Sequence, residues 1–259
     1  MPFDRTNVER RPTVAAIIPA LNEEAAIGGV VSGISPFVDM VIVADNGSTD
    51  QTVQKAQAAG AVTVSEPRPG YGRACLAGVA YALDAAADIY LFLDGDGSDA
   101  PGDAAALLDA MVAIGLDLVI GSRALGDVEP GALTLPQRFG NWLACHLMTV
   151  IWKSAFTDLG PFRAIRRSAY ERLGMSAPTY GWTVQMQVRA LKSGLRTGEV
   201  AVTYRRRIGV SKISGTVRGV FLAGVHILGT IAVEALTPNA ARPAPVAERQ
   251  YQSAGPAKR

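Results

Sequence analysis

The chain has 259 residues, of which 49% are hydrophobic, and it carries a formal net charge of +2. This length and composition are typical of one globular domain with room for a sizeable core. The charge is too small for a general nucleic-acid binder, a class that shows a much larger basic excess. The basic residues are nevertheless uneven, because Arg205, Arg206, Arg207 and Lys212 cluster late in the chain.

Cysteine usage and apolar segments bear on the compartment in which the protein works. Cys75 and Cys145 lack metal-ligand spacing, so we interpret them as buried free thiols in a reduced, cytoplasmic setting. Residues 1–11 are polar and contain no apolar signal core. Residues 219–236 come nearest to a spanning helix but include His226 and Glu234. They fit an unusually apolar soluble helix, a short membrane helix, or a helix that faces a membrane surface or a partner.

Strands and helices alternate through the first 120 residues. The apolar patterns predict strands at residues 13–19, 40–44, 61–65, 89–93 and 117–120, and helices at 25–34, 51–59, 73–87 and 103–114. Such alternation is typical of a doubly wound, parallel α/β sheet. We expect Asn22 to cap the first helix and interpret Asp50 as a cap of the second.

The pattern changes after Gly121. A long helical stretch at residues 136–155 precedes a Gly-Pro loop, and two further helices and a strand at residues 200–204 follow. Residues 237–259 combine Pro, Ala and scattered charges, which predicts a disordered tail.

The run at residues 89–98 is the most informative part of the chain. A continuous apolar strand stops there at Asp94 and Asp96, which Gly95 separates. Carboxylates at the carboxyl end of a parallel strand lie where α/β sheets bind ligands. They suit a hard divalent cation that bridges the protein to a diphosphate. The alternative interpretation is a solvated acidic turn.

Two more strand ends carry polar groups, at residues 19–23 and 45–50, and the loop at residues 66–73 adds a fourth segment. In an open parallel sheet these ends share one edge, so we expect them to converge. Gly70 and Gly72 permit close backbone approach, and the helix start that follows favours anions. No dinucleotide-binding or P-loop glycine motif is present in the sequence, so a nucleotide held by carboxylates and a metal is the better account.

Here the chain resembles a known family. Residues 17–23, 43–50 and 93–97 look like the motifs of family 2 glycosyltransferases of GT-A fold, in order and spacing. Residues 121–123, 138, 158–163 and 206–212 resemble the dolichyl-phosphate mannose synthase branch, which acts on polyprenyl phosphates. The resemblance covers residues 13–235. It implies an α/β, Rossmann-like GT-A domain at residues 1–236 with a C-terminal helical extension, divided into a nucleotide-sugar half (13–121) and an acceptor half (122–236).

The resemblance also implies roles for individual residues. The metal, Mg²⁺ or Mn²⁺, would be held by Asp94 and Asp96, and Arg206 would help to stabilise the departing nucleoside diphosphate. The acceptor phosphate would be bound by Arg123, Arg138 and Lys212, since a guanidinium fork matches phosphate oxygens. The expected nucleotide-binding residues are Pro19, Leu21, Glu23, Asp45, Gly72, Arg73, Asp94 and Gly95.

The implied reaction is inverting transfer of a hexose from a UDP-sugar, or second a GDP-sugar, to a polyprenyl phosphate. We expect a cytoplasmic protein that is peripheral at the inner face of the cell membrane, could form a homodimer and has no nucleic-acid partner. Membrane contact would come from residues 219–236 or from the region around Trp142, Trp152 and Phe156. One alternative keeps the donor and uses a soluble or lipid hydroxyl acceptor, with Asp96, Asp99 or Asp158 as base. Another is a non-catalytic nucleotide-sugar binding protein.

Several positions depart from the family pattern or have a packing interpretation. Asn46 follows Asp45 where many relatives have a second Asp, and Gln185 stands where relatives often have Glu, which weakens any proposal of a base on that helix. His146 and His226 occur in apolar helical contexts, so we expect them to pack in the core or at an interface rather than bind metal.

Overall fold

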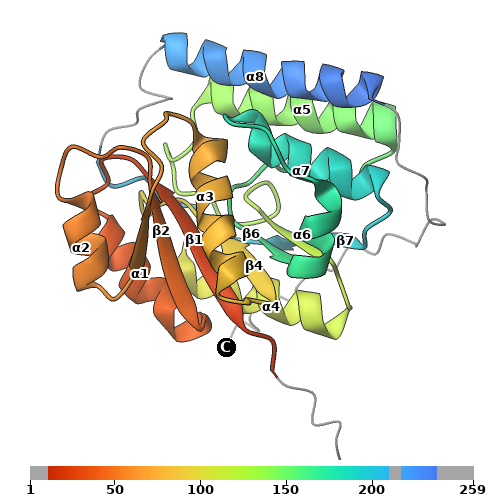
Figure 1. The fold of residues 1–259 in the computed structure, drawn as a ribbon. Helices are drawn as coiled ribbons and strands as arrows, with labels where there is room; N and C mark the ends of the chain where they lie inside the picture. The colour runs from red at the N-terminus through yellow and green to blue at the C-terminus, as the bar shows by residue number, and fades with distance from the viewer. Residues whose placement is uncertain (1–10, 210–216, 238–259) are drawn as a thin grey trace, which may run out of the picture.

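The computed structural model describes residues 11–209 and 217–237. Lys212 and nearly all of the predicted tail at residues 237–259 lie outside the described residues. A seven-stranded sheet forms the centre of the fold, in the order β3-β2-β1-β4-β6-β5-β7 (Figure 1). Its strands are β1 (Val14–Ala20), β2 (Met40–Asp45), β3 (Val62–Ser65), β4 (Ile89–Phe92), β5 (Leu118–Ser122), β6 (Arg163–Arg166) and β7 (Thr197–Ala201).

Helices cover both faces of this sheet. They are α1 (Ile27–Ile34), α2 (Thr52–Ala58), α3 (Tyr71–Asp84), α4 (Ala104–Ala113), α5 (Leu135–Trp152), α6 (Arg167–Leu173), α7 (Gly181–Lys192) and α8 (Val217–Leu236). Successive strand residues point to opposite faces. In β1, Ile17 packs into a core with α3 and α5 to α8, whereas Ile18 packs into a second core with α1, α2 and α4. The predicted α/β fold with flanking helices is therefore confirmed.

One strand differs from the expected parallel pattern. β6 was not predicted, and it pairs antiparallel with both β4 and β5. It has four residues bounded by arginines, so it lacks the apolar run that marks a strand in sequence. Its Arg163 is fully buried and donates to the carbonyl oxygens of Leu159, Gly160 and Thr183. The strand predicted at residues 200–204 is also wrong in its bounds, since β7 ends at Ala201.

The predicted cap at Asn22 is wrong. Helix α1 begins at Ile27, and Ala26 precedes it without a side-chain cap. Asn22 instead has a left-handed backbone (φ 51°), and its side-chain oxygen accepts a hydrogen bond of 2.7 Å from the amide of Thr49. It ties the loop after β1 to the loop after β2. Asp50 does accept a bond of 3.0 Å from the amide of Thr52, the first residue of α2.

The carboxyl ends of the three adjacent strands β2, β1 and β4 lie at one edge of the sheet. Ala20 at the end of β1 is in register with Asp45 at the end of β2, and Asp94 comes two residues after the end of β4. Helices α5 and α8 pack together at the same end of the molecule (Figure 1). Polar strand ends and a pair of apolar helices therefore face the same region.

Candidate active site

A cavity of about 1330 Å³ opens at this edge. Its lining begins at the strand ends, with Pro19 near the end of β1, Leu21 and Glu23 just after that strand, and Asp94, Gly95 and Asp96 after β4. It continues past Arg123 and Arg138 to side chains of α5 and on to Ile227 and Leu228 of α8. The cavity therefore joins an acidic end to an apolar end.

The loop after β2 is organised by two neighbouring polar side chains. The carboxylate of Asp45 accepts from the amides of Gly47 (3.3 Å) and Ser48 (3.1 Å). The Asn46 amide nitrogen donates to the carbonyl oxygens of Glu66 (2.8 Å) and Arg68 (2.9 Å), while its oxygen accepts from the amide of Gly70 (2.8 Å). A carboxylate could not donate those two bonds. Asn46 thus fixes the loop before α3, which is a structural reason for its departure from the family pattern.

The predicted nucleotide-binding residues fall into two groups. Five of them line the cavity, together with Asn46 and Gly70, whereas Asp45, Gly72 and Arg73 are not among the lining residues. A Cβ at Gly72 would collide with the carbonyl oxygen of Ala177, and the amide of Arg73 donates to Pro178. Gly72 therefore lets α3 approach residues 177–178, a packing role that a sequence pattern does not distinguish from ligand approach.

Three aspartates crowd the end of β4. The amide of Asp94 donates to Asp99 (3.0 Å), and Oδ1 of Asp96 accepts from the amide and hydroxyl of Ser98 at 2.9 and 2.6 Å. Burial, and then repulsion by Asp96 and Asp99, raises the pKa of Asp94 well above its ordinary value. Burial also raises the pKa of Asp99 to about 7. The buried Oδ1 of Asp99 has no hydrogen-bond partner.

This cluster has an excess of negative charge that a cation would neutralise, so Asp94 and Asp96 fit a divalent metal. Within the described residues, however, no group of three or more His, Cys, Asp or Glu side chains is arranged to hold one. Hard cations such as Mg²⁺ commonly take one or two protein carboxylates and complete their shell with phosphate oxygens and water. The donor set therefore suits a cation that binds together with a diphosphate.

The structure brings Arg207, and not Arg206, to these carboxylates. Nη2 of Arg207 lies 2.9 Å from Oε1 of Glu23 and 3.4 Å from Oδ2 of Asp96. Arg206 points the other way, where its Nε donates to the carbonyl of Pro130 (2.7 Å), and it does not line the cavity. Adjacent side chains of an extended segment point to opposite sides. Strict alternation from Tyr204, which lines the cavity, would turn Arg206 inward, so the sequence held no signal for Arg207; the backbone bonds of Arg205 and Ile208 to the loop after β4 set its direction.

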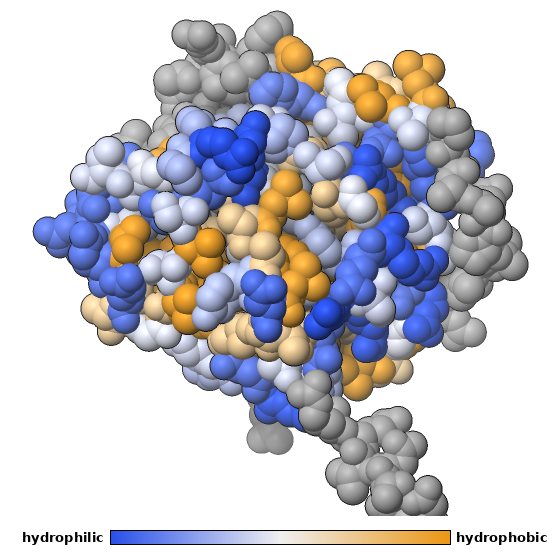
Figure 2. Space-filling model, in the orientation of Figure 1, coloured by the Kyte–Doolittle hydropathy of each residue, from blue (hydrophilic) through white to orange (hydrophobic). Residues whose placement is uncertain are grey.

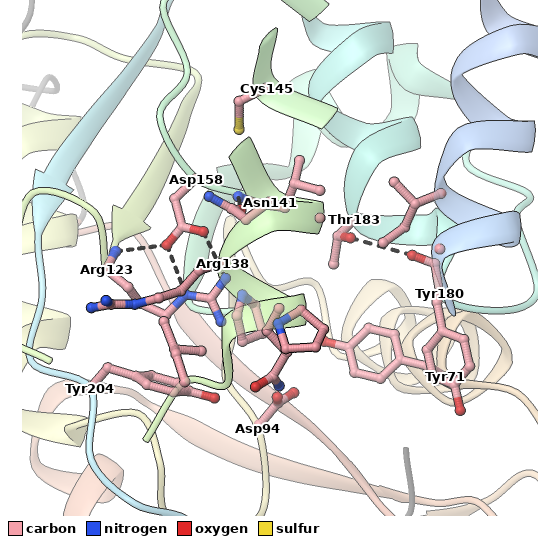
Figure 3. A pocket seen from close by; sticks show the side chains of 18 of the residues that line it. Tyr71, Asp94, Arg123, Arg138, Asn141, Cys145, Asp158, Tyr180, Thr183 and Tyr204 are labelled. Carbon is pink, nitrogen blue, oxygen red and sulfur yellow. Dashed lines mark hydrogen bonds and ion pairs between the residues drawn. The ribbon is translucent and has the colours of Figure 1, made fainter. Parts of the chain in front are cut away.

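Arg123 lies deeper in the cavity and is held by Asp158 (Figure 3). Its Nε and Nη2 bind the two carboxylate oxygens at 2.8 and 2.7 Å, its amide donates to the same carboxylate, and its guanidinium lies 5.0 Å from the ring centre of Tyr204. Burial alone would lower the pKa of Arg123, but the Asp158 carboxylate raises it above its usual value. The guanidinium therefore stays charged and fixed in orientation.

A second carboxylate, that of Glu199, holds the backbone of the loop that carries Asp158. Glu199 of β7 accepts hydrogen bonds from the amides of Thr157 (2.9 Å) and Asp158 (3.2 Å). Burial raises the pKa of Glu199 to about 7. Sequence reasoning did not single out Glu199, because its role depends on the register of β7 beside the loop at residues 157–158.

Arg138 reaches the cavity from the first turns of α5. That helix starts with a capping box in which Thr134 and Gln137 exchange hydrogen bonds, with Pro136 in its first turn. In Figure 3 the Arg138 side chain extends beside Arg123 and Asp158, and both arginines line the cavity. Two guanidinium groups therefore stand between the acidic end and the apolar end.

The apolar end continues onto the surface. One stripe of α5 exposes Leu135 (80%), Phe139 (61%), Trp142 (57%) and Val150 (58%). Helix α8 adds Val225, Leu228, Val233 and Leu236, and Figure 2 shows hydrophobic side chains along the α8 edge. His146 stacks on Trp142 with ring centres 5.4 Å apart, and His226 stacks on Tyr180 at 6.1 Å. Trp152 is half-buried and Phe156 buried, so neither belongs to this exposed surface. In the described part of the chain, no helix has the length and apolarity to cross a bilayer.

The fold and the family match define a class: a glycosyltransferase built on a GT-A sheet. The profile of glycosyl transferase family 2 matches residues 15–174, and the chain belongs to that family. An uncharacterized glycosyltransferase of Mycobacterium tuberculosis is 37% identical over 81% of this chain and 94% of the relative. The polyprenol monophosphomannose synthase of Mycolicibacterium smegmatis is 32% identical over 80% of this chain and 83% of the relative. The resemblance to the polyprenyl-phosphate branch is thus supported.

A solved structure supports the fold. Glucosyl-3-phosphoglycerate synthase of Mycobacterium tuberculosis, in complex with Mn²⁺, UDP and glucosyl-3-phosphoglycerate, matches with a TM-score of 0.69 at 24% identity. The match covers 88% of this chain and 81% of that chain. The GT-A arrangement predicted from sequence is confirmed by it.

Proposed function

We propose that this glycosyltransferase transfers a hexose from a nucleoside-diphosphate sugar to a polyprenyl phosphate, with inversion at the anomeric carbon. The observation that carries the proposal is the single cavity that runs from paired carboxylates, past two arginines, to apolar helices. Each part of this cavity matches one part of the two substrates.

The donor is assigned to the acidic end. Asp94 and Asp96 would hold Mg²⁺ or Mn²⁺ with the diphosphate, and the loops after β1 and β2 would hold the nucleoside. A bound divalent cation supplies Lewis-acid neutralisation of the charge that builds on the departing nucleoside diphosphate. A UDP-sugar is the first donor to test, since the solved structural neighbour binds UDP, and a GDP-sugar is the second.

The acceptor is assigned to the arginines and the apolar end. Arg123 and Arg138 would bind the phosphate, because a guanidinium matches phosphate oxygens with parallel hydrogen bonds. Asp158 binds two of the three guanidinium nitrogens of Arg123, Nε and Nη2, and this orients the third, Nη1, to donate to the phosphate. The apolar lining from α5 and α8, including Trp142, Ile227 and Leu228, suits an isoprenoid chain. Two relatives named for polyprenol or undecaprenyl phosphate support this acceptor class.

The chemistry of a phosphate acceptor fits the side chains at hand. A phosphate monoester is anionic near neutral pH, so the nucleophile needs no strong base, and the protein contributes mainly positioning and electrostatic stabilisation. The phosphate oxygen would attack the anomeric carbon directly, and the nucleoside diphosphate would leave from the opposite face. An α-linked donor then gives a β-linked product.

The exposed apolar residues of α5 and α8 support peripheral contact with a membrane. A helix surface with several exposed large apolar side chains commonly lies at a membrane interface or a partner. A polyprenyl phosphate resides in a membrane, so its chain would enter the cavity from that side. We assign this contact to the inner face of the cell membrane.

A hydroxyl acceptor is the second candidate, and the site offers it a weak base. Such an acceptor must lose its proton to a side chain. Asp99 has a pKa of about 7, but it is buried and does not line the cavity. Asp158 lines the cavity but is bound to Arg123. The phosphate acceptor is therefore preferred.

The proposal is tested by supplying radiolabelled UDP- and GDP-sugars with Mg²⁺ or Mn²⁺ and a polyprenyl phosphate, then extracting the mixture with organic solvent. We expect metal-dependent label in the organic phase with one donor. Donor turnover with label only in the aqueous phase would transfer the assignment to a soluble acceptor. No turnover of any donor, with nucleotide still bound, would favour a non-catalytic binding protein.

A further inference from the structure

Arg207 occupies the position at which a cation would meet the metal-binding carboxylates. Its Nη2 bridges Glu23 (2.9 Å) and Asp96 (3.4 Å), one residue from each of the loops after β1 and β4. We propose that Arg207 competes with the divalent metal for Asp96, so that the metal binds well only together with the nucleotide. This inference rests on the proposed function, because it takes Asp94 and Asp96 as the metal site.

Both oxygens of Asp96 are engaged in this arrangement. Oδ1 accepts from the amide and the hydroxyl of Ser98, and Oδ2 faces Arg207. A metal that approaches Oδ2 must therefore displace a positive charge. Like charges repel at this range, so the guanidinium and a divalent cation cannot share that oxygen.

The backbone fixes the direction of Arg207. The amide of Arg205 donates to the carbonyl of Ser98, and the amide of Ile208 donates to the carbonyl of Asp96, both at 2.8 Å. Residues 205–208 thus run along the loop that carries the carboxylates. On the other side of the chain, the amide of Arg206 donates to Glu129 at 2.8 Å. These contacts turn Arg207 inward and Arg206 outward.

The ion pairs of Arg207 with Glu23 and Asp96 can compete with a divalent metal, but a metal that binds together with a nucleotide can displace them. The Arg207 side chain is 27% exposed, which screens its ion pairs, and its buried Nε has no hydrogen-bond acceptor. A buried donor without an acceptor is unfavourable. A diphosphate oxygen at the donor end would accept from Nε while the metal takes Asp96. The nucleotide therefore gives the Nε of Arg207 an acceptor, and the metal replaces Arg207 at Asp96, so that the two ligands bind better together than separately.

The test is a Mn²⁺ titration of the full chain, with free Mn²⁺ measured by electron paramagnetic resonance and no substrate present. We expect Arg207→Gln to tighten Mn²⁺ binding about two- to fivefold, the factor that loss of one partly exposed ion pair corresponds to. Arg206→Gln is the matched control, since it removes the same charge one residue away, and it should change binding less than twofold. Arg207→Met also removes the charge but keeps the apolar stem of the side chain, so it should tighten binding in the same way and keeps the test available if Arg207→Gln fails to fold.

The same titration is repeated with saturating UDP and, in parallel, GDP. We expect one of the two nucleotides to tighten Mn²⁺ binding to the wild type. With that nucleotide bound, the Mn²⁺ affinities of the wild type and of Arg207→Gln should differ less than they do without it. If Arg207→Gln binds Mn²⁺ no more tightly than Arg206→Gln while nucleotide still promotes metal binding, the competition is overturned and the proposed function stands. If no form binds Mn²⁺ with either nucleotide, both the competition and the metal-dependent function are overturned.

Discussion

The two ends of the cavity are built differently. At the strand ends, short loops are held by many directed hydrogen bonds, such as the three made by the Asn46 side chain and the two that Ser98 gives to Asp96. At the helical end, α5 and α8 present apolar side chains, several of them exposed to solvent. A small, charged donor requires polar groups at fixed positions, whereas a long apolar chain requires a large apolar surface and few directed interactions.

Arg123 and Arg138 lie where these two regions meet. Arg123 is partly buried, with its side chain 15% exposed, and is bound by Asp158, while Arg138 is exposed on α5. Arg123 therefore belongs to the fixed, preorganised region and Arg138 to the open one. Substitutions at the two ends should therefore affect different substrates.

The largest effect is expected at the donor end. Asp96→Ala removes a carboxylate proposed to hold the metal, and we expect transfer to fall by about 10³-fold or more. Circular dichroism should show the fold retained, since Asp96 lies in a loop after β4. Asp84→Ala, which removes an exposed carboxylate from α3, is the matched control and should transfer normally. Transfer by Asp96→Ala with unchanged metal dependence would contradict the metal assignment.

At the junction, Arg138→Ala should separate the two substrates. Loss of a charge-assisted hydrogen bond to phosphate corresponds to about 1.5–3 kcal/mol, so we expect the acceptor KM to rise by roughly tenfold or more while the donor KM changes little. Steady-state kinetics with each substrate varied in turn measures both values. Arg172→Ala, an exposed arginine of α6, is the control. Equal changes in both KM values would remove Arg138 from the acceptor site.

At the helical end the effect should appear in membrane binding. Val150 is 58% exposed on α5 and does not line the cavity. Val150→Ser should weaken binding to phospholipid vesicles about fivefold, as expected for roughly 1 kcal/mol of apolar burial. Val112 on α4, 63% exposed, is a matched control, and Val112→Ser should bind vesicles like the wild type. Cosedimentation with vesicles measures both, and equal losses would place the contact elsewhere.

The smallest effect concerns Glu199, which supports the fixed region. Its pKa is about 7 in the folded protein against an ordinary value of 4.5, so the folded state binds the proton more tightly. Its contribution to stability is present below about pH 4.5 and is lost as the pH rises through 7. Glu199→Gln keeps the shape of the side chain without its charge, so it should lack this loss of stability at high pH. The change in Tm from pH 5 to pH 8 should therefore be about 2–4 °C more positive in the variant than in the wild type, the shift that 1 kcal/mol produces at this size. An unchanged pH dependence of Tm in calorimetry would contradict this.

Much of the sheet and its acidic edge could be predicted from sequence, because buried parallel strands leave continuous apolar runs and their ends share an edge. β6 could not, since Arg163 is satisfied by carbonyl groups that only the tertiary fold supplies. The same limit applies to Arg206 and Arg207. Three consecutive arginines are equivalent in sequence, and only the bonds of residues 205–208 to the loop after β4 decide which one faces inward.

We propose that the acceptor end of the cavity binds a phosphate on an isoprenoid chain. The most direct measurement compares transfer from the preferred donor to a polyprenyl phosphate and to the polyprenol of the same length, under identical conditions. We expect product from the phosphate and almost none from the alcohol, since the phosphate is already anionic and the site offers it two guanidinium groups. Equal transfer to the alcohol, or transfer to neither when a soluble acceptor is used efficiently, would contradict it.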